Sequence, residues 1–312
     1  MPIMPQTDAW KEWLGLPESR LRVKARTAVD TGNDDDLWNL TEAWLRTKGK
    51  AGATVSPSTI TNYKIGIRVL LSDWRERGDF DLLNPDPEAG QQWIRNLEAR
   101  YKPGTVITKR TAARHLYAAL RWADVTKADP FGDARVEADP IPPWEKRQPY
   151  TQDELDKLLA IVNDPYDRAL LLLGAHAGLR AKECCQLKWD DVDLEQKRLV
   201  VQLGKGRTTR TLYFGSTLTD ALLDVRPLIA TGRFVLPYRS PASAWRHMKL
   251  LCLRADVPPK GVHSLRHTAA TRLYGQMGAL PTAQHLGHKS MSGIPTYAKW
   301  NENTYREGMK DW

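Results

Sequence analysis

Five short segments in the second half of the sequence carry side chains suited to holding and attacking a phosphate. Each alone is a common pattern with little weight. Together they supply two arginines, a lysine, two histidines and a tyrosine, a set that fits phosphoryl transfer. The segments are Gly178-Leu179-Arg180, Gly204-Lys205-Gly206, His263-Ser264-Leu265-Arg266, Leu286-Gly287-His288, and Tyr297, nine residues beyond that last histidine.

Each of these residue types has its own part in such a reaction. The forked donors of Arg180 and Arg266 match a pair of phosphate oxygens, on which the transition state carries charge. His263 and His288 supply further N–H donors, and the lysine can protonate a leaving oxygen if its pKa falls from ~10.4. Tyr297, with a phenol pKa of ~10, attacks phosphorus when cations stabilise its phenolate or a base takes its proton.

The elements that position these segments follow from the apolar spacing after residue 150. Residues Thr151 to Glu154 have the form of a capping box, which predicts the start of a helix. A leucine-rich helix is expected from about Tyr166 to His176, ended by Gly178. Alternating residues then predict a hairpin around the Gly-Lys-Gly turn, and helical patterns resume from about Leu218. This half is therefore predicted to be mainly helical with one small sheet.

The first half is predicted to be a small helical bundle, because apolar residues recur there at helical spacing. In one of its helices Ser56 is the expected N-cap and Pro57 the first helical residue. A proline-rich stretch without apolar periodicity separates the halves and indicates an extended linker. The predicted divisions are an N-terminal extension (1–35), a helical domain (36–138), the linker (139–150) and a second domain with a C-terminal tail (151–312).

The composition is that of a folded globular protein, and its basic charge suggests a polyanionic partner, with solubility alone as the alternative interpretation. The 312 residues include 46 Lys+Arg and 37 Asp+Glu, for a net charge of +9, and 41% of them are apolar. Residues 1–140 carry a net +1 and residues 141–312 a net +8, so the excess lies in the half that holds the five segments. The composition excludes a disordered chain, a collagen and a coiled coil.

Other classes are excluded by what the sequence lacks. The longest apolar run, 169–175, is far shorter than the roughly 20 residues of a membrane span, and the N-terminus has no signal-peptide pattern, so a soluble intracellular protein is expected. Cys184, Cys185 and Cys252 fit no disulfide framework or zinc pattern and are expected to be reduced and structural. No cofactor or metal is predicted.

A basic stretch in the otherwise neutral first half is a candidate phosphate-contacting surface. Its seven cations face only one acidic residue, Glu98. A solvated helix face is the alternative interpretation. The predicted contact residues are Arg95, Arg100, Lys102, Lys109, Arg110, Arg114 and Arg121, with Arg207 and Arg210 beside the second-half hairpin turn.

The segments GLRAKE, GKG, HSLRHTAAT and LGHKSMSGIPTY resemble, in order and spacing, the catalytic domain of the tyrosine recombinase (phage integrase) family. More weakly, the first domain resembles the family's helical, SAM-like core-binding domain, and the layout is that of the compact Xer-type members. Residues Gly293 to Pro295 depart from the small polar residues that usually precede the nucleophile. The family's catalytic set falls on Arg180, Lys205, His263, Arg266, His288 and the nucleophile Tyr297, with Glu183 at an acidic position that helps to hold the site.

The resemblance implies a reaction, a partner and a location. Tyr297 would form a 3′-phosphotyrosyl link and free a 5′-hydroxyl, and the hydroxyl of a partner strand would reverse the step without metal or ATP. The two domains would clamp double-stranded DNA, and four protomers, identical or including a related recombinase, would form a synapse in the cytoplasm at the nucleoid. The spacing of Tyr305, Met309 and Trp312 predicts a tail helix that docks on a neighbouring protomer or on its own domain.

Two alternatives stay open at this point. A type IB topoisomerase would use the same tyrosyl link without a synapse, and a noncatalytic DNA-binding protein would keep the fold without needing the nucleophile. His267, His285, Tyr274 and Tyr305 are interpreted as packing or surface residues. The sequence does not distinguish chromosome dimer resolution from element integration or plasmid maintenance.

Overall fold

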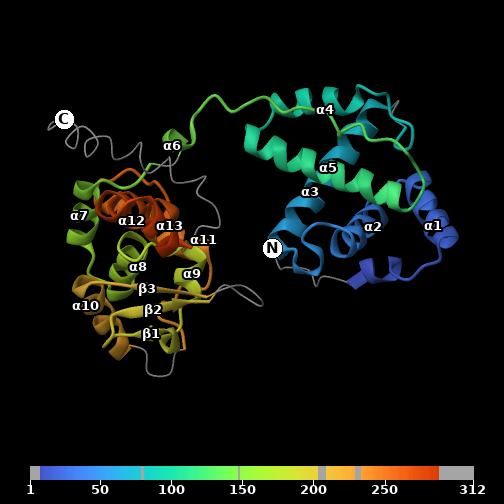
Figure 1. Cartoon of the computed structure of the whole chain (residues 1–312). Coiled ribbons are helices and arrows are strands. Elements are labelled where there is room, and N and C mark those ends of the chain that lie inside the picture. The colour runs from blue at the N-terminus through green and yellow to red at the C-terminus, as the bar shows by residue number, and fades with distance from the viewer. Residues whose placement is uncertain (1–7, 79–80, 147, 203–208, 229–232, 288–312) are drawn as a thin grey trace. The chain divides into compact units, whose positions relative to one another are not determined.

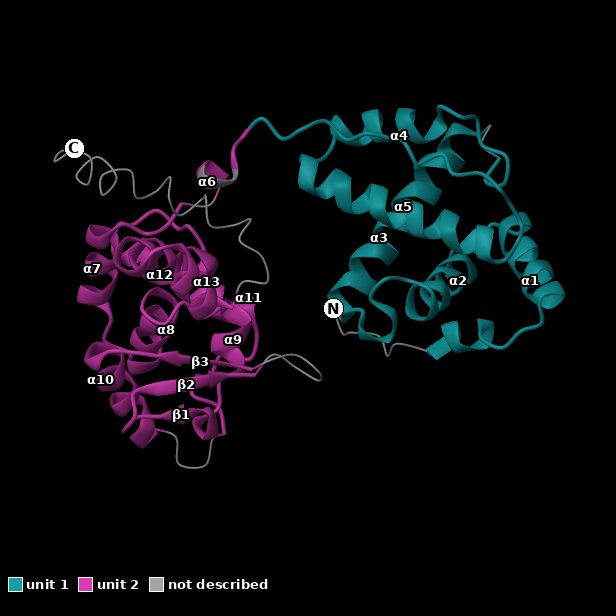
Figure 2. Ribbon diagram, in the orientation of Figure 1, with its two compact units in different colours: residues 1–140 teal, residues 141–312 magenta. Residues whose placement is uncertain are grey.

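A computed structural model describes residues 8–78, 81–146, 148–202, 209–228 and 233–287 of the chain (Figure 1). The chain divides into two compact units, residues 1–140 and 141–312, and the division falls inside the predicted linker (Figure 2). Among the described residues, no helix has the length and apolar composition that a membrane span requires. Lys205, Arg207, His288, Tyr297 and the predicted tail helix lie outside the described residues.

Unit 1 is a bundle of helices, as predicted. Ser56 accepts a hydrogen bond from the backbone N–H of Thr59 and caps the helix that begins at Pro57. The long helices α3 and α5 approach closely, since a Cβ at Gly66 would lie 2.7 Å from the Ala112 Cβ. The elements are η1 (Asp8–Trp13), α1 (Glu18–Asp30), α2 (Asp34–Thr47), η2 (Gly52–Thr54), α3 (Pro57–Arg77), α4 (Ala89–Glu98) and α5 (Pro103–Trp122).

The described part of the predicted N-terminal extension, residues 8–35, contributes to the core of unit 1. Helix α1 buries Leu21, Ala25 and Ala28, which are spaced as one helical stripe, in the same apolar cluster as residues of α2, α3 and α5. Trp13 is buried there too. The domain therefore does not begin at residue 36. The stripe has only one large apolar residue, which is why its periodicity is weak in the sequence.

Unit 2 is mainly helical with a three-stranded antiparallel sheet, which confirms the predicted fold class. The sheet adds the short strand β1 to the predicted hairpin of β2 and β3. The elements are α6 (Pro143–Lys146), α7 (Gln152–Ile161), α8 (Pro165–Ala175), α9 (Ala181–Gln186), η3 (Trp189–Asp191), β1 (Val192–Asp193), β2 (Arg198–Val201), β3 (Arg210–Tyr213), α10 (Ser216–Val225), η4 (Arg226–Leu228), α11 (Pro241–Arg254), α12 (Val262–Met277) and α13 (Ala279–Leu286).

Helix α8 lies at the centre of unit 2 and packs against both α10 and α12 (Figure 1). Its leucines 170–173 are fully buried, so the second half of the helix is apolar on all sides. Gly174 lets α12 approach, because a Cβ there would lie 2.7 Å from the Leu265 Cβ. Leu265 precedes Arg266 on α12, and this contact therefore fixes the depth of that arginine. The three cysteines are buried and form no disulfide.

We expect Gly174→Ala to lower the free energy of unfolding of unit 2 by about 1–3 kcal/mol, the usual cost of overpacking a core. Urea unfolding monitored by circular dichroism measures the change. Gly104→Ala is the control, because Gly104 is helical and a Cβ there meets nothing within 4 Å. Equal stability of the two variants would contradict the assigned close approach of α8 and α12.

Candidate active site

A tight turn after α8 places Arg180. Gly178 has a left-handed backbone with φ of +70°, and its N–H donates to the Gly174 carbonyl. A Cβ at this glycine would also lie 2.6 Å from the Leu286 Cδ2, so the turn and the end of α13 are in contact. Arg180 follows two residues later and is the N-cap of α9.

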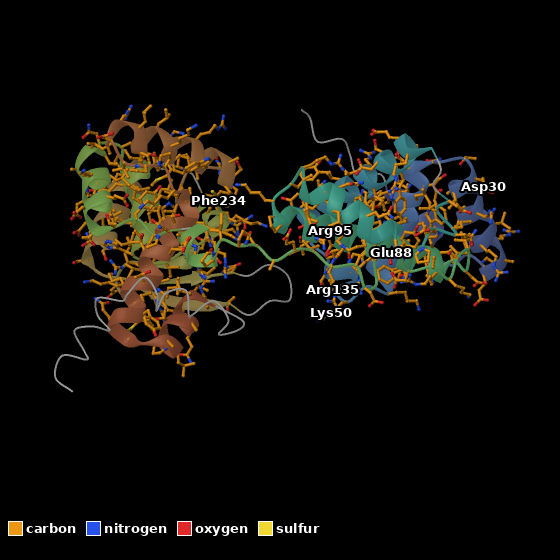
Figure 3. All side chains as sticks on the ribbon, turned by 90° about the horizontal axis from the view of Figure 1, so that it is seen from above. Asp30, Lys50, Glu88, Arg95, Arg135 and Phe234 are labelled. Atoms are coloured by element: carbon orange, nitrogen blue, oxygen red, sulfur yellow. The ribbon has the colours of Figure 1, made fainter. Side chains whose placement is uncertain are left out.

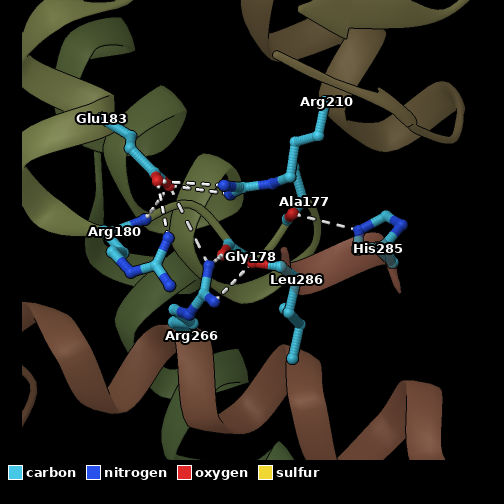
Figure 4. A network of polar contacts seen from close by, with 8 residues as sticks. All are labelled: Ala177, Gly178, Arg180, Glu183, Arg210, Arg266, His285 and Leu286. Carbon is cyan, nitrogen blue, oxygen red and sulfur yellow. Dashed lines mark hydrogen bonds and ion pairs between the residues drawn. The ribbon is translucent and has the colours of Figure 1, made fainter. Parts of the chain in front are cut away.

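The carboxylate of Glu183 is the centre of the site (Figure 4). It accepts hydrogen bonds from the backbone N–H and the Nη1 of Arg180, both at 2.8 Å. It also accepts two from Arg210, from Nη1 at 3.0 Å and Nη2 at 2.8 Å. The Nη1 of Arg266 lies 3.9 Å from Oε2. One carboxylate from α9 thus joins arginines from three separate segments.

The charge of Glu183 is held by its partners against the effect of burial. Burial acts to raise the pKa of this carboxyl, whose side chain is only 10% exposed. The hydrogen bonds and positive charges of Arg210 and Arg180 outweigh burial and lower the pKa to about 2. Glu183 is therefore ionised across the physiological range.

Arg266 is the most deeply buried cation of the site. Its side chain is 2% exposed, and it donates from Nη1 to the Gly178 carbonyl at 2.6 Å and from Nη2 to the Leu286 carbonyl at 2.7 Å. These bonds connect α12 to the turn before Arg180 and to the end of α13. His263 lies one turn earlier on α12 and is half-buried. As the sequence predicts, the three-residue spacing places it on the same helix face as Arg266.

Two histidines near the site have structural contacts. His285 lies 3.1 Å from the Ala177 carbonyl through Nε2, so that nitrogen carries the proton and donates. Burial lowers its pKa, which keeps the ring neutral. His267 packs edge-on against the ring of His263, with centroids 4.8 Å apart. Their positions agree with their interpretation as packing residues.

Arg210 is not the surface cation that the sequence suggested. Its side chain is 8% exposed, whereas that of Arg180 is 38% exposed. The pairing of β3 with β2 turns this arginine into the unit, where its guanidinium meets Glu183. The prediction that Arg210 contacts DNA is therefore wrong, because its guanidinium is buried against Glu183.

The basic stretch of unit 1 contains two kinds of cation. Lys109 is buried, its Nζ lies 4.6 Å from the centre of the Tyr101 ring, and burial lowers its pKa. It is therefore not a surface cation, contrary to expectation. Arg110 and Arg121 donate to the carbonyls of Ala134 and Ala128. All three side chains make contacts within unit 1, and Arg121 also pairs with Asp129.

The other four cations of the stretch are exposed. Arg95, drawn with the side chains of Figure 3, pairs with Glu98. Arg100 pairs with Asp73. Lys102 and Arg114 are exposed and have no ion pair within the described residues. They are the best placed of the stretch to meet a phosphate.

Two solved integrase structures have the same fold. The Tn1549 transposon integrase in complex with circular intermediate DNA matches with a TM-score of 0.63 at 20% identity, covering 84% of this chain and 94% of that one. A lambda integrase dimer bound to a core site matches with a TM-score of 0.65 at 17% identity, covering 83% and 75%. The chain therefore shares the fold of these two integrases.

The chain belongs to the phage integrase family, whose family model matches residues 149–304. The tyrosine recombinase XerC of Bacillus subtilis is 29% identical over 282 residues, which cover 80% of this chain and 88% of that protein. The tyrosine recombinase XerA of Pyrococcus horikoshii is 30% identical over 175 residues, 51% of this chain, and the match spans 59% of XerA.

Acid should weaken the structure through Glu183. Its folded pKa of about 2 lies below its ordinary value of 4.5, so its contribution is complete above pH 4.5 and is lost as the pH falls toward 2. We expect Glu183→Gln to be less stable than the parent by about 3–5 kcal/mol at pH 7, and by progressively less below pH 4.5.

Chemical unfolding of both proteins between pH 3 and pH 7 measures this difference. Glu195→Gln is the control, since Glu195 is exposed in the same unit. A stability difference for Glu183→Gln that stays constant over this pH range would show that the carboxylate is not held ionised by the arginines.

Proposed function

We propose that this tyrosine-type site-specific recombinase cuts and rejoins duplex DNA through a covalent bond between Tyr297 and a DNA 3′-phosphate. The observation that supports the proposal is the convergence of Arg180 and Arg266 on Glu183, from segments that lie 86 residues apart in the sequence. Two guanidinium groups beside one site provide the charge that phosphoryl transfer requires.

The reaction needs no outside source of energy. The Tyr297 hydroxyl loses its proton to water as its oxygen attacks phosphorus, the bond from phosphorus to the 5′ oxygen breaks, and Lys205 gives a proton to that leaving oxygen. The 5′-hydroxyl of a partner strand then attacks the phosphotyrosine, which releases the tyrosine. Because the covalent link keeps one phosphate ester bond for each one broken, ATP is not required. The arginines supply the positive charge that a metal ion would otherwise provide.

Arg180 and Arg266 have different parts in this scheme. Arg180 is the most exposed arginine of the cluster and is assigned a direct contact with the nonbridging oxygens. Arg266 is almost fully buried, and a buried charge acts on a nearby phosphate with little screening by water. His263 and His288 are assigned further hydrogen bonds to the same oxygens.

The kinship with Xer recombinases favours recombination over topoisomerase activity or DNA binding alone. We assign the exposed residues Lys102 and Arg114 of unit 1 to contacts with the DNA backbone, and protomers to a tetrameric synapse on two DNA sites. The DNA substrate places the protein in the cytoplasm, at the nucleoid. Chromosome dimer resolution and element integration use this same chemistry.

We expect Tyr297→Phe to abolish covalent protein–DNA adducts while DNA affinity stays within about threefold, because only the attacking oxygen is lost. Adducts are trapped in cells and separated by denaturing electrophoresis, and the attached DNA is sequenced to give the site. Addition of EDTA to the purified reaction should leave the adduct yield unchanged.

Tyr305→Phe is the matched control and should form adducts at the parent's level. Adducts that persist in Tyr297→Phe and vanish in Tyr305→Phe would move the nucleophile. Loss of all cleavage in EDTA would contradict the metal-independent mechanism.

Salt dependence tests the proposed contacts of unit 1. Each phosphate contact adds about 0.9 to the slope of log affinity against log salt concentration. Lys102→Gln and Arg114→Gln should therefore each flatten the slope by about one unit on a random-sequence duplex.

Lys109→Met is the control, since Lys109 is buried, and should leave the slope unchanged. Fluorescence anisotropy measures the DNA affinity at salt concentrations from about 50 to about 300 mM. Unchanged slopes in both glutamine variants would exclude this surface.

A further inference from the structure

We propose that Arg210 is a positioning residue for DNA strand cleavage, which neutralises Glu183 so that Arg180 keeps its charge for the phosphate. The inference rests on the proposed function above. It assigns to Arg210 a part in the reaction that acts through Glu183 rather than through contact with DNA.

Geometry separates Arg210 from the other two arginines. Its two Nη atoms bond to the two oxygens of Glu183, a fork-to-fork pairing that fixes the plane of the carboxylate. With 8% of its side chain exposed, it has little access to a substrate. Arg180 bonds to the same carboxylate through Nη1 alone and is 38% exposed.

Charge explains what this pairing accomplishes. The carboxylate of Glu183 has to lie beside Arg180. It accepts a hydrogen bond from the backbone N–H of Arg180 at the start of α9 and another from the Arg180 side chain, which orients that side chain. An ionised carboxylate beside Arg180 would, however, offset the positive charge offered to a phosphate. Arg210 cancels this negative charge. The cluster then holds Arg180 through hydrogen bonds and keeps a net positive charge.

The stem of Arg210 has a second contact that ties the site together. A Cβ at Gly287 would lie 2.8 Å from the Arg210 Cδ and 3.0 Å from its Nη1. Gly287 has a left-handed φ of +65° at the end of α13. It immediately precedes His288 in the sequence. Arg210 therefore connects the β3 strand, α9 and the end of α13.

The variants Arg210→Met, Arg210→Lys and Glu183→Gln/Arg210→Met of the full chain test this inference. Cleavage is measured as the single-turnover rate of adduct formation on a nicked duplex that carries the trapped site. DNA affinity is measured on the same duplex. Arg198→Met is the matched control, because Arg198 lies on the neighbouring strand in an exposed pair with Asp193.

We expect Arg210→Met to slow adduct formation by about 10- to 100-fold, the usual effect of removing a residue that orients a site group. DNA affinity should stay within about threefold, since Arg210 does not contact DNA. Arg210→Lys should recover part of the rate because it restores the charge without the fork. The double variant should be faster than Arg210→Met, because Glu183→Gln removes the charge left uncompensated.

A purely structural role would give a different pattern. In that case the double variant would be slower than Arg210→Met, as independent losses add. That result, or a parental rate in Arg210→Met, would overturn the inference.

A second measurement needs no DNA cleavage. The pKa of Glu183, followed by carbon NMR in the free protein, should rise by about 1–3 units in Arg210→Met. If the parent protein forms no adduct, the proposed function fails, and the titration still tests the pairing of Arg210 with Glu183. An unchanged pKa of Glu183 in Arg210→Met would overturn the inference.

Discussion

The ionised carboxylate of Glu183 is the interaction on which the catalytic unit depends. It is buried, which alone would favour its neutral form, and it is kept charged by hydrogen bonds from Arg210 and Arg180. In turn it holds in one place cations that would otherwise repel one another. The fold thus brings the arginines of the proposed phosphate site together, and one carboxylate offsets part of their repulsion.

Close backbone approaches make this arrangement possible. Gly174 brings α12 against α8, Gly178 turns the chain beside Leu286, and Gly287 leaves room for the Arg210 side chain. At each position a Cβ would lie closer than 3.0 Å to a neighbouring atom. The carbonyls of the turn and of α13 then accept the two hydrogen bonds of Arg266. Packing and catalysis are therefore linked, since the glycines set the distances that the charges require.

Much of this could be predicted from the sequence, and the remainder depends on long-range pairing. Local signals predicted the capping box at Thr151 and the helix that carries His263 and Arg266. The family resemblance, rather than a local signal, pointed to Glu183 as an acidic residue that helps to hold the site, and the structure pairs it with Arg180. The burial of Arg210 follows from the strand pairing that faces it toward a glutamate 27 residues away, and no local pattern distinguishes it from a surface arginine. The sequence likewise predicts Lys109 at the surface, whereas the structure buries it. Helix periodicity alone does not show how deeply a lysine packs.

The proposed division of roles is that Arg180 and Arg266 bind the phosphate, whereas Arg210 pairs with Glu183. A crystal structure with vanadate bridging Tyr297 and the 5′-hydroxyl of a nicked DNA site tests it most directly, because vanadate mimics the five-coordinate phosphorus of the transition state. The predicted result is Arg180 and Arg266 within hydrogen-bonding distance of the equatorial vanadate oxygens, and Arg210 still paired with Glu183. Arg210 bound to those oxygens, with Glu183 left to Arg180 alone, would contradict the claim.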